Sequence, residues 1–325
     1  LLPPVLPGEG SRTRLSLARG ESRLTDARLL HHRRDGAWDL LAAASRRAQD
    51  GFLVPEGFTA PFNQSANRTR TNSDLEEWSL LLRARRQLGE SGSLRLLFSG
   101  VDGEKGVPPE THLDDGARYW RFPVSRRGLL GAALDVPLDD GRRWTLAATA
   151  AADFGEQEIR AYDDATYATP AREPGVDYET DRDRTGWLRA RVRRGLGTDG
   201  ALTVQGAARH TRHRESLVWD GPELTYTQWL GSLVAEAALP LGRGWRWRGG
   251  GGYEFASTPE TGDKPARART DAAVAHARVD RDLGAGVGLH AAVSRRSRFP
   301  ALRELYSGAL GRFVPNPDLA PERQD

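Results

Sequence analysis

The chain has 325 residues, of which 38% are hydrophobic and 28% are charged. It contains no Cys, which excludes disulfides, Cys-ligated zinc, iron–sulfur clusters and a catalytic thiol. Charge-free apolar stretches such as 146–152 are far shorter than the ~18 residues that a membrane helix needs, so a helical membrane protein is excluded too. Met is also absent, and we expect that processing or truncation removed the natural N terminus.

The basic residues are almost all arginine and are spread along the whole chain. Of 47 Lys and Arg residues only Lys105 and Lys264 are lysine, and 44 Asp and Glu residues leave a formal net charge of +3. A nucleic-acid-binding protein concentrates its basic residues in one patch, whereas here Arg is interleaved with Asp and Glu. We therefore expect solvated surface arginines and no nucleic-acid partner.

Much of the chain alternates between apolar and polar residues with a period of two, which is typical of β-strands with one apolar face. In 143–154 the even positions are Trp, Leu, Ala and Phe, and the odd positions are small or polar. Leu94, Leu96 and Phe98 alternate in the same way with residues that include Arg95. The pattern predicts about 13 strands, at 11–19, 26–34, 37–49, 75–88, 93–103, 117–137, 142–162, 180–196, 201–218, 225–240, 245–258, 269–282 and 285–297.

Short turns and longer loops alternate between these strands. The short turns are rich in Gly and Asp, which tolerate the positive φ of hairpin turns, and lie at 35–36, 88–92, 139–141, 197–200, 241–244 and 282–284. The longer polar connections are 50–74, 102–116, 155–180, 219–224, 257–269 and 298–321. This alternation places the short turns at one end of the structure and the long loops at the other.

Long alternating strands with unequal connections are the signature of outer-membrane β-barrels. Most predicted strands reach the ~9–11 residues that cross a bilayer at a tilt, and we expect Leu96 to face lipid and Arg95 the lumen. Aromatic residues near strand ends fit interfacial girdles: Trp38, Trp78, Trp120, Trp144, Tyr162, Trp245 and Trp247. A soluble β-propeller, whose blades repeat every ~40–50 residues, is the alternative fold. Two long strands per period and the lack of a recurring blade motif count against it.

The most specific motif lies in residues 298–322, which read RFPALRELYSGALGRFVPNPDLAPE. Its prolines cannot donate to a strand ladder, so a large ordered loop is expected here. The segment resembles a mid-barrel motif of TonB-dependent outer-membrane receptors, in which a Leu-Arg-Glu-Leu-Tyr turn precedes Asn-Pro-Asp-Leu-x-Pro-Glu at the start of the next strand. The matching residues are Phe299, Pro300, Leu302, Arg303, Glu304, Leu305, Tyr306, Asn316, Pro317, Leu319, Pro321 and Glu322. Residues 102–108 resemble an early loop of the same family.

The resemblance implies an all-β fold, an antiparallel up-and-down transmembrane barrel of 22 strands with short periplasmic turns, long extracellular loops and an N-terminal plug. Residues 1–325 are then expected to be a single domain that covers the first half to two-thirds of the barrel, without the plug and the closing strands.

The resemblance also implies a location in the outer membrane of a Gram-negative-type bacterium, among its lipids. The function would be uptake of a scarce solute, such as a ferric siderophore or cobalamin, held as a small molecule or metal chelate. Energy would come from the TonB–ExbB–ExbD complex, which contacts N-terminal parts that the sequence lacks. The first alternative is a passive outer-membrane barrel that works like a porin, and the second is a soluble β-propeller.

The other motifs in the sequence do not indicate a functional site. The glycines of 195–200 spell a dinucleotide fingerprint, but a strand follows where that motif needs a helix. The run Gly249–Gly252 is expected to give a kink or room for a plug. Adjacent histidines on a strand point to opposite faces, and we expect no third ligand near either histidine pair, at 31–32 or at 210/213, so no metal site is expected. Loop carboxylates such as Glu156 have no Ser or His partner, so we expect neither an enzyme nor a cofactor.

Ligand binding is expected at the long-loop end, because short turns offer neither the length nor the chemical variety to enclose a solute. Aromatic and Arg side chains suit anionic, aromatic chelates through stacking and charge-assisted hydrogen bonds. The candidates are Tyr119, Trp120, Arg121, Tyr162, Tyr167, Tyr306 and Arg312. The alternative for each is a structural role, as a girdle residue or as a brace within its own loop.

Overall fold

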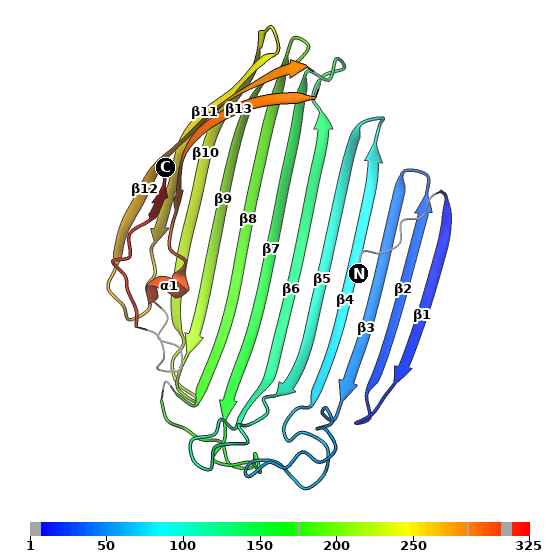
Figure 1. The fold of residues 1–325 in the computed structure, drawn as a ribbon, viewed down its shortest axis with the longest axis vertical. Coiled ribbons are helices and arrows are strands. Elements are labelled where there is room, and N and C mark those ends of the chain that lie inside the picture. Colours follow the sequence, from blue (N-terminus) through cyan, green and yellow to red (C-terminus); the bar gives the residue numbers. More distant parts are fainter. Residues whose placement is uncertain (1–7, 175, 285, 307–313) are drawn as a thin grey trace.

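The computed structural model describes residues 8–174, 176–284, 286–306 and 314–325. These residues form one antiparallel sheet of 14 strands, in which each strand pairs with its neighbours in sequence (Figure 1). The strands are β1 (Gly10–Arg19), β2 (Thr25–Asp35), β3 (Trp38–Gln49), β4 (Leu75–Leu88), β5 (Gly92–Gly106), β6 (Trp120–Pro137), β7 (Trp144–Ala161), β8 (Tyr178–Leu196), β9 (Gly200–Ser216), β10 (Leu224–Gly242), β11 (Trp245–Thr258), β12 (Arg267–Gly284), β13 (Val287–Arg298) and β14 (Glu322–Gln324). A one-turn helix, α1 (Leu302–Tyr306), precedes β14.

The predicted all-β, up-and-down architecture is confirmed. The 13 predicted strands all form, with ends shifted by no more than three residues, and β14 follows them. The short turns meet at one end of the sheet and the long loops at the other, at the top and bottom of Figure 1. Residues 302–306, predicted as a turn, form α1 instead. In the described part of the chain, no helix is long and apolar enough to cross a membrane.

The two faces of the sheet differ in polarity because directly paired residues of antiparallel strands point to the same side. Leu82 on β4 pairs with Phe98 on β5, and Phe98 pairs with Leu130 on β6, so apolar residues form rows across one face. Leu130 and Leu188 of this outer face are each more than half exposed. A contiguous apolar face of this size needs an apolar surrounding.

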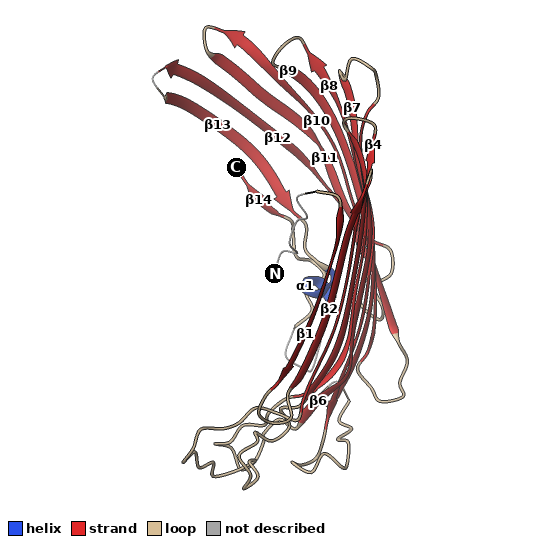
Figure 2. Cartoon of the chain, turned by 90° about the vertical axis from the view of Figure 1, so that its right-hand side faces the viewer, coloured by secondary structure: helices blue, strands red, loops and turns tan. Residues whose placement is uncertain are grey.

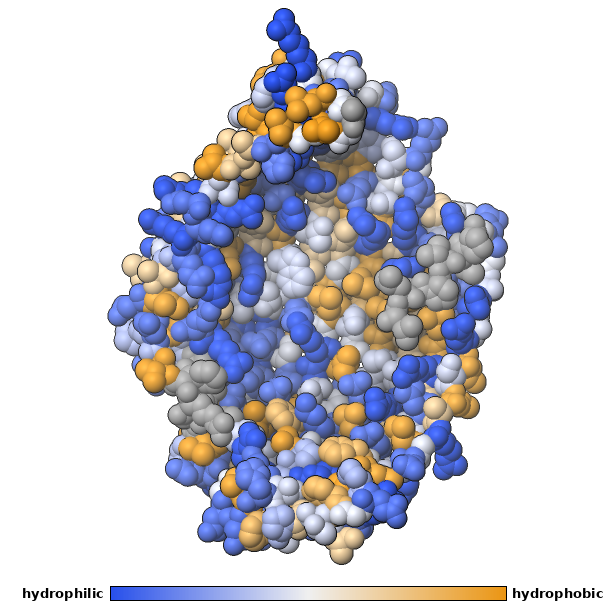
Figure 3. Space-filling model, in the orientation of Figure 1, coloured by the Kyte–Doolittle hydropathy of each residue, from blue (hydrophilic) through white to orange (hydrophobic). Residues whose placement is uncertain are grey.

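The opposite, inner face is concave and carries the polar side chains. Figure 2 shows the sheet curving toward the side on which α1 lies, with β12 to β14 bending furthest. Figure 3 looks onto this concave side, where hydrophilic residues are spread between apolar patches. Arg95, which pairs directly with Ala133 and not with the apolar row, belongs to this face. The predicted orientation of Leu96 and Arg95 toward opposite faces is confirmed.

Toward the long loops the outer face changes from apolar to charged. Arg126 pairs with Asp102 at 2.9 Å, and Arg182 pairs with Glu156 at 3.0 Å. On β8 the last apolar outer residue before this rim is Leu188, followed by Gly186 and then Arg184. Residues 178–184 of β8 and 211–216 of β9 therefore lie beyond the apolar band, on the loop side of it.

At the short-turn end, three strands begin with a tryptophan that faces outward. Trp38, Trp144 and Trp245 pair directly with Arg86, Arg194 and Arg281 of the next strand. The three guanidinium carbons lie 5.3, 5.2 and 4.9 Å from the indole centroids. In such a cation–π contact the indole keeps its apolar surroundings while the charged end of the arginine reaches the solvent beyond the strand end. These residues match the predicted girdle, whereas Tyr162 packs against Tyr167 in the loops.

The glycine run of β11 accommodates the neighbouring strand. A Cβ at Gly250 or Gly252 would overlap the backbone carbonyl of Ala235 or Leu233 on β10. The ladders on both sides pass through the run without a register shift. These glycines therefore allow β10 and β11 to approach closely in the curved part of the sheet, while the expected kink and the room for a plug stay predictions.

Candidate functional site

Five ionisable residues meet on the concave face of β8 and β9, beyond the apolar band. Glu179, Asp181 and Asp183 alternate on β8, and His213 and Glu215 alternate on β9, so that all five side chains point inward. The register places Asp181 opposite Glu215 and Asp183 opposite His213. We call these five residues the β8–β9 cluster.

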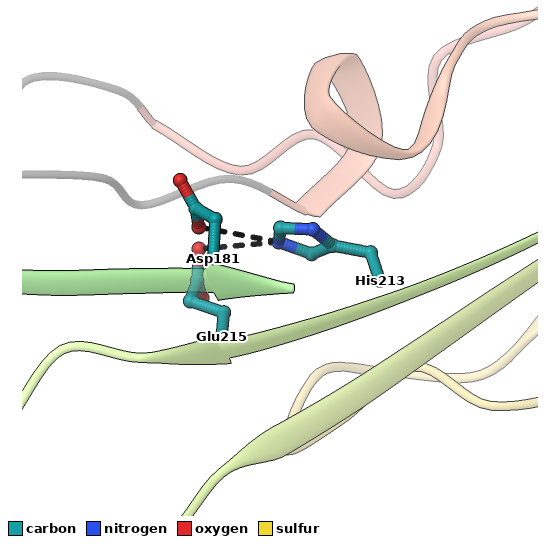
Figure 4. Close-up of side chains that lie close together, drawn as sticks. All are labelled: Asp181, His213 and Glu215. Carbon is teal, nitrogen blue, oxygen red and sulfur yellow. Dashed lines mark ion pairs between the residues drawn. The ribbon is translucent and has the colours of Figure 1, made fainter. Parts of the chain in front are cut away.

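The imidazole of His213 lies at the centre of the cluster. Its Nδ1 is 2.9 Å from Oδ1 of Asp183, which accepts a hydrogen bond from it. Its Nε2 is 3.8 Å from Oδ1 of Asp181 and 3.8 Å from Oε2 of Glu215, as the dashed lines in Figure 4 show. These two distances are too long for hydrogen bonds, so Nε2 faces two carboxylates without a direct bond to either.

Burial and crowding of like charges shape the protonation of the cluster. Burial, reinforced by the charge of Asp181, raises the pKa of Glu179 to about 8. Burial also opposes a charge on His213, but its hydrogen bond to Asp183 and the nearby carboxylates of Glu215 and Asp181 outweigh it and raise the pKa of His213 to about 10. The carboxyl Oε2 of Glu179 is buried without a hydrogen-bond partner among the described residues. Four carboxyl groups thus share the cluster with one imidazole.

Helix α1 covers the neighbouring strand on the same side of the sheet. Tyr226 of β10 is 2% exposed, and its ring stacks on Tyr306 of α1 at a centroid distance of 5.8 Å. The hydroxyl of Tyr226 lies 3.4 Å from Oε1 of Glu215, which accepts its hydrogen. Leu305, 1% exposed, completes this small core. The core therefore joins α1 to the β8–β9 cluster.

The two described ends of the motif of residues 298–322 are held in place by polar contacts with the strands. The backbone carbonyl of Pro300 accepts a hydrogen bond from Nε2 of Gln228 at 2.8 Å. Arg298 pairs with Glu304 and, at 3.0 Å, with Glu322 of β14. The second half of the motif is held by Arg267, which donates to the carbonyls of Pro317 and Leu319.

Three of the predicted ligand-binding residues meet within the long loops. Tyr167 lies edge-on to Tyr119 and to Tyr162, with centroid distances of 6.2 and 5.5 Å. The hydroxyl of Tyr119 donates to Oδ1 of Asn63 at 2.6 Å. Burial raises the pKa of Tyr167 to about 12, so this phenol stays neutral. We call Tyr119, Tyr162 and Tyr167 the tyrosine cluster.

The other predicted ligand-binding residues lie elsewhere or are already engaged. Arg121 forms a two-pronged pair with Asp74, whose oxygens lie 2.9 and 2.5 Å from its guanidinium nitrogens. Trp120 stands at the start of β6, with Arg118 5.4 Å above its ring. Tyr306 belongs to the core beneath α1 and not to the tyrosine cluster. Arg312 lies outside the described residues.

The β8–β9 cluster was missed because its members look unrelated in the sequence. The expectation that His213 has no further ligand nearby is wrong: Asp181 and Glu215 offer ligand atoms within 4.8 Å of one another and of His213. His210 faces the outer side, where it packs on Trp229 at 4.4 Å, as the odd spacing of the two histidines requires. The signal that could have found the cluster is alternate ionisable residues on both strands of one hairpin: three acidic residues on β8 and a His with a Glu on β9.

Comparisons with known proteins place this geometry in a wider context. No protein-family model and no curated protein matches the sequence. Among solved structures, the copper transporter OprC aligns with a TM-score of 0.69 at 16% identity, over 99% of this chain and 50% of that one. The FrpB iron transporter from Neisseria meningitidis aligns with a TM-score of 0.65 at 15% identity, over 90% and 47%. The fold is that of a TonB-dependent receptor barrel.

A third structure of this kind supports the same assignment. The hemophore receptor HasR of Serratia marcescens, solved with its hemophore HasA and heme, aligns with a TM-score of 0.61 at 14% identity, over 97% of this chain and 49% of that one. The chain thus spans about half the length of the solved chains that it matches. These neighbours are named as transporters and receptors, in agreement with the resemblance that residues 298–322 indicated.

Proposed function

We propose that this chain is part of the barrel of an outer-membrane receptor that imports a scarce solute. The observation that carries the proposal is a single sheet with an apolar outer face, a polar concave face and all long loops at one end. Such a sheet is stable with lipid on its outer side and a polar lumen on the other. The loop end would then face outward and receive the solute.

The finer part of the proposal concerns the solute and the source of energy. We propose a ferric siderophore, cobalamin or another metal chelate as the solute, and the TonB–ExbB–ExbD complex as the partner that supplies energy. Solved structures that share this fold are named as transporters or receptors of copper, iron, siderophore and ferric citrate, which supports a metal-containing solute. Residues 1–325 would be one barrel domain of that receptor.

The proposal is tested by expressing the complete gene in a Gram-negative host that lacks its own siderophore and cobalamin receptors. We expect the protein in the outer-membrane fraction and uptake of one labelled ferric siderophore or of cobalamin. Deletion of TonB should abolish uptake while leaving the protein in place. Uptake that persists without TonB would instead support a passive porin, and recovery in the soluble fraction would support a soluble β-propeller.

We further propose that the tyrosine cluster contacts the solute. Tyr119→Ala combined with Tyr162→Ala removes two aromatic faces and should weaken solute binding about tenfold or more, because stacking on the chelate is lost. Binding is measured by competition with a labelled chelate on whole cells of equal receptor content. Tyr253→Ala, which removes an exposed outer-face aromatic that is not part of the tyrosine cluster, is the control and should bind normally. Equal binding by the double variant would make the cluster purely structural.

A further inference from the structure

We propose that Asp181, His213 and Glu215 bind a divalent transition-metal ion of the Zn²⁺ class in the wall of the barrel. The inference goes beyond the proposed function, because this ion is bound by the protein and is not the transported solute. The site lies on the concave face beside α1 and is reached from the lumen, since the side chains of Asp181 and His213 are about one-fifth exposed.

The spacing of the three ligand atoms suits an ion between them. Nε2 of His213 lies 3.8 Å from each carboxylate oxygen, and all three atoms lie within 4.8 Å of one another. Bonds of ~2.1 Å in a tetrahedral zinc site separate two ligands by about 3.4 Å. Inward shifts of up to about 0.7 Å per ligand atom would therefore complete the contacts, and the partly exposed side chains of Asp181 and His213 can make them by small torsional changes.

The orientation of the imidazole is also that of a metal ligand. Asp183 accepts the hydrogen of Nδ1 at 2.9 Å, and the other nitrogen, Nε2, is directed at Asp181 and Glu215, where a metal ion would take the place of its proton. A carboxylate behind a metal-bound histidine fixes the ring and makes it a better ligand. The hairpin thus supplies two carboxylates and one imidazole as ligands and a further carboxylate as support.

A second, independent observation is the buried carboxylate of Glu179. This residue is 7% exposed, and its Oε2 has no hydrogen-bond partner among the residues that the structure describes. Its close neighbours are Asp181 and Glu215, and the positive charge of Arg303 acts on it from α1. A buried carboxyl oxygen without a hydrogen-bond partner, next to Asp181 and Glu215, would gain a partner if a cation lay among the three groups.

The donor set selects the class of ion. Calcium and magnesium prefer a full shell of oxygen ligands, whereas one imidazole with two carboxylates suits Zn²⁺ and its neighbours. Three protein ligands leave one position for water from the lumen. Because Glu215 also accepts from Tyr226, which stacks on Tyr306, an ion here would stiffen the contact between α1 and the wall.

The test is calorimetric titration of the complete receptor, purified in detergent and freed of metal with a chelator, with ZnCl₂. We expect one bound ion per chain, at least about 100-fold weaker binding in His213→Ala, and 10–100-fold weaker binding in Asp183→Asn, which keeps the shape but loses the supporting charge. His210→Ala, on the same strand but the outer face, should bind like the wild type. Co²⁺ in place of Zn²⁺ should give the visible absorption of a tetrahedral site, and Glu215→Gln should abolish it.

Two results would overturn the inference. One is a wild-type receptor that binds no Zn²⁺; the other is equal affinity in the wild type and in both Glu215→Gln and His213→Ala. Folding of each variant is checked by its heat-modifiable migration in electrophoresis, and Glu215→Gln, which preserves side-chain volume, serves if His213→Ala fails to fold. Solute uptake is measured separately, so a wild-type receptor that takes up solute normally but binds no Zn²⁺ refutes this site without touching the proposed function.

Discussion

Leu96→Arg is expected to block assembly of the barrel, at a cost of ~2–4 kcal/mol for an arginine near the middle of the apolar band. Leu96 lies on the outer face, 43% exposed, between Ala84 of β4 and Ala132 of β6. Neither neighbour offers a carboxylate that could pair with the new charge. The measurement is the amount of folded, heat-modifiable protein in the outer membrane, together with urea unfolding of the variant in lipid.

The adjacent residue provides the matched control. Arg95 faces the lumen and pairs with Asp135, and both side chains are about half exposed to solvent. Because exposed ion pairs contribute ~1 kcal/mol or less, Arg95→Ala should assemble almost normally. If both variants assembled equally well, the assignment of the outer face to lipid would be wrong.

Leu305→Ala should release α1 from its contact with β10. Leu305 is 1% exposed in the core with Tyr226 and Tyr306, and truncation of a buried leucine costs about 2–5 kcal/mol. A loss of 2 kcal/mol raises the open population of the loop by about thirtyfold. The measurement is the rate of tryptic cleavage after Arg303 in intact outer membranes, which follows the open population when opening is rapid.

Val314 provides the control for Leu305, because it lies in the same loop but is exposed. It is 91% exposed, so Val314→Ala removes apolar atoms without opening a cavity and should leave the rate of cleavage after Arg303 unchanged. Rapid cleavage in both variants, or in neither, would mean that the core beneath α1 does not hold the loop.

The strands could be predicted because each carries its own signal. The alternation in 143–154 is visible without any partner strand, and Gly and Asp mark the turns that end each hairpin. Helix α1 could not be predicted in this way, since five residues give barely one turn and its three buried side chains become apolar contacts only against Tyr226 of β10. Its sequence was therefore read as a turn.

The β8–β9 cluster depends on register, which a strand does not reveal by itself. Leu196 pairs with Gly200 at the turn, and the ladder then runs without interruption to Asp183 opposite His213 and Asp181 opposite Glu215. A single bulge between turn and loop would have moved His213 to the other face. Sequence alone can list alternate acidic positions, but the absence of a bulge over such a long hairpin is known only from the fold.

The three outward tryptophans of the short-turn rim have a geometric consequence. They start β3, β7 and β11, so each is four strands from the next, a separation of ~19 Å along the sheet. Three such points on a curved wall define a plane. If the sheet tilted in a bilayer about any axis in that plane, at least one indole and its arginine would leave the headgroup level for hydrocarbon or water. If the proposed function holds, these three contacts would set the tilt of the sheet in the membrane and the height of its loops above it.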